Sequence, residues 1–271
     1  LATVVSQALS TCWLVYLLAV KHRLLTFGRL HGERFRHTCR RIMSFAVPAS
    51  IGMVLMPITS GIITALVSRH GNTALAAVSA ASRIEMVAFM IPMALGMSLM
   101  PFVSQNFGAG YFDRIQEARR FSTRFALVYG AVIAVIFFVA APYLAQIFTR
   151  DSQVTALFSR YIRIIAFGYG MMEVHRYCGF ILTGIHRPAW STLLNAMRML
   201  VFLVPLSLLG NRLLGLNGLF VARLTTDIAA GSIGLLLISR LLNTQRPVPE
   251  DVQRPDKDSE PPSAQGFVQE F

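Results

Sequence analysis

Residues 121–147 read FSTRFALVYGAVIAVIFFVAAPYLAQI, and Arg124 is the only charged side chain among them. A helix of roughly 20 apolar residues is long enough to cross the ~30 Å hydrocarbon core of a bilayer. The stretch lacks the alternation of apolar and polar side chains, in segments of about ten residues, that is typical of a membrane β-strand. It therefore predicts a membrane-spanning α-helix.

Six more apolar runs occur along the chain, so the sequence predicts an all-α, polytopic transmembrane bundle of about seven spans. The composition agrees, because 54% of the residues are hydrophobic and only 14% are charged, whereas a soluble domain carries about 25% charged residues. These proportions exclude collagen-like, disulfide-scaffold and wholly disordered proteins. The expected spans are residues 1–20, 45–67, 76–103, 121–147, 157–183, 188–209 and 216–241.

The formal net charge is +12, and residues 21–41 between the first two runs hold seven basic side chains and one acidic one. Such an excess is typical of a cytoplasmic loop, so we read the positive charge as a sign of topology and expect no nucleic-acid partner. Alternating the spans from this loop places the C-terminus in the cytoplasm. Residues 245–271 are proline-rich, charged and poor in apolar side chains, which predicts a disordered tail.

Several classes of function find no support in the residues. The three cysteines have no metal-like spacing, and there is no glycine-rich nucleotide loop and no catalytic set of side chains, so we expect neither an enzyme nor a metal or organic cofactor. A secondary transporter driven by an ion gradient is the simplest account of the pattern. The chain begins at Leu1 inside an apolar run, which suggests a truncated chain.

Ionisable side chains inside the apolar runs are the best functional candidates, because a charge within the bilayer costs about 2.5–3.5 kcal/mol on insertion scales. Glu173 is the strongest of them, since it lies near the middle of the fifth run. Tyr169 precedes it by four residues and Arg176 follows it by three, so the three share one helix face. Glu173 either takes part in ion coupling or substrate binding, or forms an internal pair with Arg176 that locks the helices; the pattern leaves both open.

Glu85 is the second candidate carboxylate and shares a helix face with Phe89. Arg83 lies two residues away and points elsewhere, so no pair with Glu85 is expected. Structure and function both remain open for Glu85.

The last two runs carry further charges. Arg223 and Asp227 are spaced i, i+4 and are expected to neutralise each other. Arg198, with Asn195 one turn earlier, is expected to contact either an anionic group or a carboxylate on another helix. His175 points away from the face of Glu173, although a proton relay through it is a further possibility.

Proline recurs within the spans, where it removes a backbone hydrogen bond and kinks the helix. Transporters use such kinks as hinges, but proline is also simply common in membrane helices. The prolines concerned are Pro48, Pro57, Pro92, Pro101, Pro142 and Pro205.

The segment after the third run reads Pro101-Phe-Val-Ser-Gln-Asn-Phe-Gly-Ala-Gly-Tyr-Phe-Asp-Arg114. Gly108 and Gly110 allow a tight turn at the membrane surface, and the charged residues from Asp113 to Arg120 suit a short interfacial helix. With Gln105 and Asn106, this segment resembles the cytoplasmic loop of the multidrug and toxin extrusion (MATE) family. Ser82-Arg-Ile-Glu85 and Pro92-Met-Ala-Leu-Gly96 are similar to the eighth helix of that family.

The resemblance implies twelve helices in two six-helix lobes, of which this chain holds the second. Residues 1–20 then correspond to the sixth helix, 21–44 to a basic cytoplasmic linker, 45–242 to the C-terminal lobe and 243–271 to a cytoplasmic tail. The partners implied are the missing N-terminal lobe of the same protein, membrane lipid and small organic cations. The expected location is a bacterial inner membrane.

Members of the family export cationic, often aromatic, drugs in exchange for sodium ions or protons, which implies the same function here. Tyr169 and Glu173 match the tyrosine and acid of the tenth helix in sodium-coupled members, with Glu in place of Asp. A further carboxylate of the seventh helix has no counterpart near Met56, so the coupling ion stays open between a proton and sodium. The remaining candidates for coupling are Glu85, Arg176 and Asp227, and those for the cavity wall are Met56, Arg83, Phe89, Asn195 and Arg198.

Two other functions stay in view. A lipid-linked oligosaccharide flippase of the same superfamily needs a more cationic cavity to hold pyrophosphate, and the intramembrane arginines are consistent with one. A non-transporting membrane partner protein is the third hypothesis.

Overall fold

The computed structural model describes residues 2–21 and 32–244, and that part of the chain is helical, without a β-strand. The predicted all-α class is therefore confirmed. The chain divides into two compact units, residues 1–46 and 47–271. The predicted tail at 245–271 and residues 22–31 of the predicted linker at 21–44 lie outside the described residues, whereas residues 32–44 of the linker are helical.

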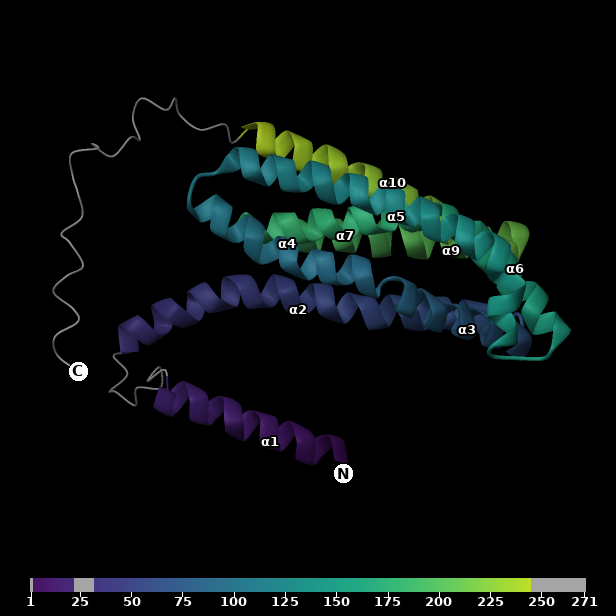
Figure 1. Ribbon diagram of the computed structural model, residues 1–271, viewed down its shortest axis with the longest axis horizontal. Coiled ribbons are helices and arrows are strands. Elements are labelled where there is room, and N and C mark those ends of the chain that lie inside the picture. The colour runs from purple at the N-terminus through teal and green to yellow at the C-terminus, as the bar shows by residue number, and fades with distance from the viewer. Residues whose placement is uncertain (1, 22–31, 245–271) are drawn as a thin grey trace. The chain divides into compact units, whose positions relative to one another are not determined.

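The first unit holds α1 (Ala2–Tyr16), the π-helix η1 (Leu17–Lys21) and the beginning of α2 (Gly32–Ser68), which continues into the second unit. The other elements, shown in Figure 1, are α3 (Asn72–Ala88), α4 (Met90–Gly108), α5 (Phe112–Gln146), α6 (Ser152–Ile165), the 3₁₀ helix η2 (Ala166–Gly168), α7 (Tyr169–Gly184), α8 (Pro188–Ala196), the π-helix η3 (Met197–Leu203), α9 (Val204–Leu214) and α10 (Leu216–Thr244).

Four helical segments of the described residues are long and apolar enough to cross a membrane, and the bent pair α3–α4 makes a fifth. The four are Ser50–Ser68, Phe112–Gln146, Pro188–Leu214 and Leu216–Leu242. This is fewer than the seven spans expected. The first expected span appears as a shorter apolar helix, Val4–Val20, and the fifth is interrupted by η2 and carries four charged residues between 160 and 176.

The third expected span is not one straight helix, because α3 and α4 meet at Phe89 with a bend of 52°. Pro92 explains the bend: it has no N–H, so the carbonyl of Ala88 loses its helical partner. The Tyr129 hydroxyl donates to that carbonyl at 2.5 Å, and the Tyr177 hydroxyl donates to the carbonyl of Pro92 at 3.0 Å. Side chains of α5 and α7 thus satisfy the backbone at the kink.

Helix α7 lies at the centre of the second unit, packed against α4, α5, α8 and α10 (Figure 1). Its approach to α5 depends on two glycines, because a Cβ atom on Gly130 would lie 2.4 Å from the Cα of Gly170. Small residues allow membrane helices to pack this closely. The central position of α7 places Tyr169, Glu173 and His175 among the other helices, where all three are buried.

The family-like segment folds differently from the loop expected. Gln105, Asn106 and Gly108 form the last turn of α4, and the Asn106 side chain donates to the carbonyl of Phe102 at 2.8 Å. Gly110 has φ = 76°, a conformation that glycine adopts without strain, and makes the turn into α5. The predicted short interfacial helix after Asp113 is wrong, because those residues form the first turns of α5, which continues without a break.

We predict that Gly130→Ala destabilises the protein, because the new methyl group meets the backbone of α7 and forces α5 away. Overpacking of this kind costs about 1–3 kcal/mol, so the midpoint of thermal unfolding in detergent is expected to fall by several degrees. Gly61→Ala is the matched control, since no atom lies within 4 Å of a Cβ built there. Equal midpoints for the two variants would contradict the close packing of α5 on α7.

Candidate functional site

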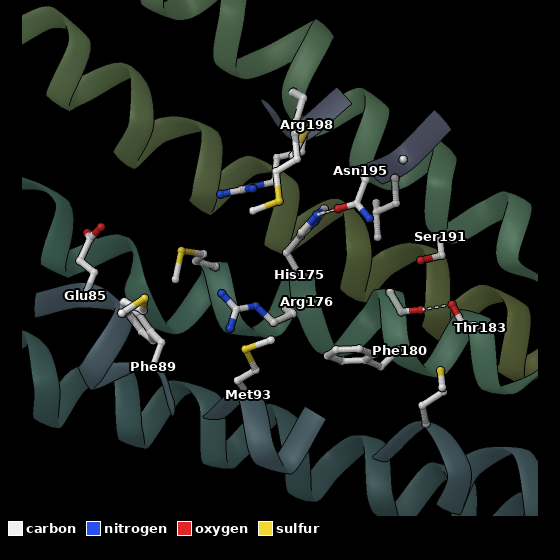
Figure 2. A pocket seen from close by; sticks show the side chains of 18 of the residues that line it. Glu85, Phe89, Met93, His175, Arg176, Phe180, Thr183, Ser191, Asn195 and Arg198 are labelled. Carbon is white, nitrogen blue, oxygen red and sulfur yellow. Dashed lines mark hydrogen bonds between the residues drawn. The ribbon is translucent and has the colours of Figure 1, made fainter. Parts of the chain in front are cut away.

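A cavity of about 670 Å³ opens among α2, α3, α4, α7, α8, η3 and α10 (Figure 2). Methionine and aromatic side chains make most of its apolar wall, and flexible thioethers adapt to ligands of different shape. Met56 and Phe89, which the sequence placed at the cavity wall, both line it. The full apolar set is Met56, Met86, Phe89, Met90, Met93, Met100, Met172, Phe180, Leu194 and Met199.

Glu85, on α3, is buried and bound by two other helices. Its Oε1 accepts a hydrogen bond from the Tyr169 hydroxyl at 2.9 Å, and its Oε2 lies 3.0 Å from Nη2 of Arg223. The Tyr169 hydroxyl thus donates to Glu85 on another helix, although Tyr169 shares a face of its own helix with Glu173. The Tyr169 ring packs edge-on against Phe89 at 4.9 Å between centroids, which directs the hydroxyl towards α3.

Arg223, on α10, is the residue that joins α3 and α6 to α10. Besides Glu85 it donates to the Tyr161 hydroxyl on α6, while its Nε lies 4.0 Å from Oδ2 of Asp227. The pair predicted from the i, i+4 spacing is thus present, but it is the longest of these contacts. The sequence gave no role to Tyr161, whose only signal was a polar group on the otherwise apolar face of α6.

Asp227 takes its closest contact from Arg198. Oδ1 of the carboxylate lies 2.6 Å from Nη2 and 3.2 Å from Nε of Arg198. Of the two alternatives left by the sequence, Arg198 therefore contacts a carboxylate on another helix. It stands within the π-helix η3, and irregular turns of this kind occur frequently at functional sites.

Glu173 and Arg176 form the pair that the sequence offered as one reading. Nη1 of Arg176 lies 3.2 Å from Oε1 of Glu173, whose side chain is fully buried while that of Arg176 is 32% exposed. Within the described residues, neither carboxylate oxygen accepts a hydrogen bond of good geometry. Figure 2 shows Arg176 reaching into the cavity. Arg176 therefore lines the cavity, whereas the buried Glu173 carboxylate is not among the lining residues.

His175 turns away from the Glu173 face, as expected, and approaches Asn195 at 3.1 Å through Nε2. The dashed line in Figure 2 marks this contact. Asn195 lines the cavity, in agreement with its predicted place. Arg83 does not: it is exposed and absent from the cavity wall, because it follows the opposite face of α3 from Glu85 and Phe89.

The six charges alternate in sign where the helices meet. Glu85, Arg223, Asp227 and Arg198 form one chain of contacts, which we call the four-residue network, and Glu173–Arg176 is a separate pair. The three arginines reach the cavity, whereas Glu85 is the only carboxylate among the lining residues that the structure describes. The site is balanced in formal charge, but its open surface is basic.

Comparison with known proteins assigns the chain to a family. The MatE family profile matches residues 48–209, more than half of the chain. The chain belongs to the MatE family. This confirms the resemblance that the sequence showed.

Two relatives are named as transport proteins. The chain is 30% identical over 236 residues to a FAD transporter of Shewanella oneidensis, a match that covers 84% of this chain and 52% of the relative. It is 20% identical to the multidrug export protein MepA of Staphylococcus haemolyticus, over 90% of this chain and 53% of that protein. The chain thus spans about half the length of the curated relatives it matches.

The fold also matches solved MATE structures. A mutant of the Vibrio cholerae MATE transporter VcmN superposes with a TM-score of 0.81 at 23% identity, over 90% of this chain and 55% of that one. The family and the apolar helices together make this an integral membrane protein.

We predict that Asp227→Asn destabilises the protein strongly, because Arg198, whose side chain is 17% exposed, loses its closest counter-charge. Removal of one partner of a buried ion pair costs about 3–5 kcal/mol. The double variant Asp227→Asn with Arg198→Met removes both charges, so most of the lost thermal stability is expected to return. Arg83→Met serves as the control for an exposed arginine; a double variant as unstable as the sum of its parts would refute the pairing.

Proposed function

We propose that this chain forms about half of an ion-coupled secondary transporter that exports amphipathic small molecules across a bacterial inner membrane, its C-terminus in the cytoplasm. The observation that carries the proposal is the cavity of about 670 Å³ with methionine and aromatic walls. Such walls suit apolar, aromatic molecules of varied shape. The remaining half of the cleft comes from the rest of the MATE fold, as a lobe of the same protein.

Ion coupling is best assigned to Glu173. Its carboxylate is fully buried and accepts no well-formed hydrogen bond from the described residues. A charge held in that way is costly, and binding a proton removes the cost. Arg176 opposes protonation at 3.2 Å, so movement of Arg176 towards a ligand in the cavity would favour it. Binding of a substrate in the cavity and binding of the ion at Glu173 are thereby linked through the Glu173–Arg176 pair. A sodium ion is the alternative, with the Glu173 carboxylate as an oxygen ligand.

Cationic drugs are the first substrate class, in exchange for protons or sodium ions. Glu85 lines the cavity beside Phe89, and an organic cation is attracted both to a carboxylate and to the face of an aromatic ring. The multidrug export protein MepA, 20% identical to this chain, supports this class.

Anionic aromatic molecules are the second class, and the basic surface of the cavity favours them. Arg176, Arg198 and Arg223 all line it, and guanidinium groups bind phosphate through paired hydrogen bonds. The FAD transporter of Shewanella oneidensis, 30% identical to this chain, exemplifies such a substrate. A lipid-linked pyrophosphate, the cargo of a flippase, belongs to the same class.

We predict that Glu173→Gln, made in the gene product that carries this chain, lowers gradient-driven efflux of a cationic dye at least tenfold. The amide keeps the shape of the side chain but binds no proton. Efflux from cells is followed by fluorescence, with the amount of protein in the membrane measured in parallel. Glu117→Gln, an exposed residue of α5, is the matched control. Undiminished efflux by Glu173→Gln would remove Glu173 from ion coupling.

A second variant, Arg176→Gln, tests whether the transported molecule is an anion or a cation. In proteoliposomes, Arg176→Gln is expected to reduce uptake of FAD strongly and to spare that of ethidium if the anion is the true cargo. If cations are the cargo, FAD is not transported by the unaltered protein and ethidium is. Transport of neither probe, in a preparation that folds and inserts, would contradict both classes.

A further inference from the structure

A second polar cavity, of about 610 Å³, lies at the turn that joins α5 to α6. This turn is at the opposite end of α5 from the Gly110 turn (Figure 1). Its lining contains two arginines and four hydroxyl groups and no acidic residue. These polar residues are Thr149, Arg150, Ser152, Thr155, Ser159 and Arg163.

The sequence of α6 sets this face apart. Ser152, Thr155, Ser159 and Arg163 recur at intervals of three or four residues, which places them on one side of the helix. The neighbouring side of the helix packs into the core through Val154, Phe158, Ile162 and Ile165. Helix α6 therefore presents hydroxyl groups and a guanidinium to the cavity.

Ser159 is the residue that points to a ligand. It is only 8% exposed, it lines the cavity, and its hydroxyl has no hydrogen-bond partner within the described residues. Buried hydroxyl groups in proteins are nearly always hydrogen-bonded. A ligand with an acceptor oxygen would satisfy this one.

The two arginines also lack counter-charges. Arg163 donates from Nε to the carbonyl of Phe138 at 3.1 Å and lies over the ring of that residue at 5.3 Å. Neither Arg163 nor Arg150 forms an ion pair within residues 32–244. The nearby Asp151 turns back to cap its own helix, accepting from the backbone of Gln153 at 2.8 Å. The cavity is thus a basic site without an internal anion.

The surroundings of the cavity are apolar and exposed. Helix α5 is one of the segments able to cross the membrane, and it ends at Gln146, next to the cavity. Phe138, Val139, Tyr143 and Ile147, all near that end, are large exposed side chains. A basic pocket at the end of a span, beside a surface of this kind, meets the phosphate region of the bilayer.

We propose that this cavity binds the phosphate group of an anionic membrane phospholipid. Arg150 and Arg163 supply charge-assisted hydrogen bonds to the phosphate oxygens, and the Ser159 hydroxyl donates a third. The acyl chains lie along the exposed apolar side chains of α5. The site is separate from the transport cavity, and it holds a structural or regulatory lipid whatever the transported molecule is.

The test is lipid binding by the purified gene product that carries this chain, counted by native mass spectrometry after removal of co-purified lipid and titration with phosphatidylglycerol. A basic residue contributes about 1 kcal/mol near an anionic lipid surface, so Arg150→Ala and Arg163→Ala are each expected to weaken binding about fivefold. Arg160→Ala is the matched control, because Arg160 is an exposed arginine of the same helix that does not line the cavity. Ser159→Ala removes only the hydroxyl and is expected to weaken binding without unfolding the helix.

Two further ligands separate the sources of the phosphate. Diacylglycerol, which has the acyl chains but no phosphate, is expected not to bind in an arginine-dependent way. Inorganic phosphate that binds with the same dependence on Arg150 and Arg163, where phosphatidylglycerol does not, would show a soluble ligand and overturn the lipid site. Equal retention of phosphatidylglycerol by the unaltered chain and by the double variant Arg150→Ala, Arg163→Ala would overturn it as well. No outcome depends on transport, so the result is independent of the proposed function.

Discussion

Charges placed between membrane helices need their counter-charges close by, because the bilayer offers no water to solvate them. In this protein Arg223 meets Glu85 on α3 and Arg198 meets Asp227 on α10. These contacts tie together segments that are distant in sequence and set the spacing of the helices around the cavity. Ion pairs therefore position the helices that carry the charged residues of the cavity wall, and the rest of the wall consists of apolar side chains.

The same requirement applies to the backbone. Pro92 deprives the Ala88 carbonyl of its helical partner, and a tyrosine hydroxyl from α5 replaces it. A second tyrosine, from α7, binds the carbonyl of Pro92 itself. Hydrogen bonds thus connect the kink between α3 and α4 to both α5 and α7. A change in the angle of the kink would require Tyr129 and Tyr177 to move with it or to lose these bonds.

Local contacts were accessible from the sequence, and distant ones were not. The spacing of Glu173 and Arg176 within one helix gave their pair as one of two alternatives, and the pair is present. Glu85 and Arg223 stand 138 residues apart, and periodicity carries no information about which helices become neighbours. Tyr169 was assigned to the wrong acid for the same reason, since its partner lies across the bundle. The helical class followed from the length of the apolar runs and from their lack of strand-like alternation. Fewer than seven of the described helices are long and apolar enough to cross a membrane unaided, because η2 and the bend at Phe89 interrupt runs that look continuous.

The π-helix η3 has a mechanical consequence for the charge it carries. A π turn holds more residues than an α turn, so a return of Met197–Leu203 to α geometry would rotate α9 about its axis relative to α8. Arg198 is the second residue of that segment, and it lies 2.6 Å from Asp227. The ion pair is therefore made where the helix changes from α to π geometry, and the residues that follow Arg198 point in directions that an unbroken α-helix would not give them.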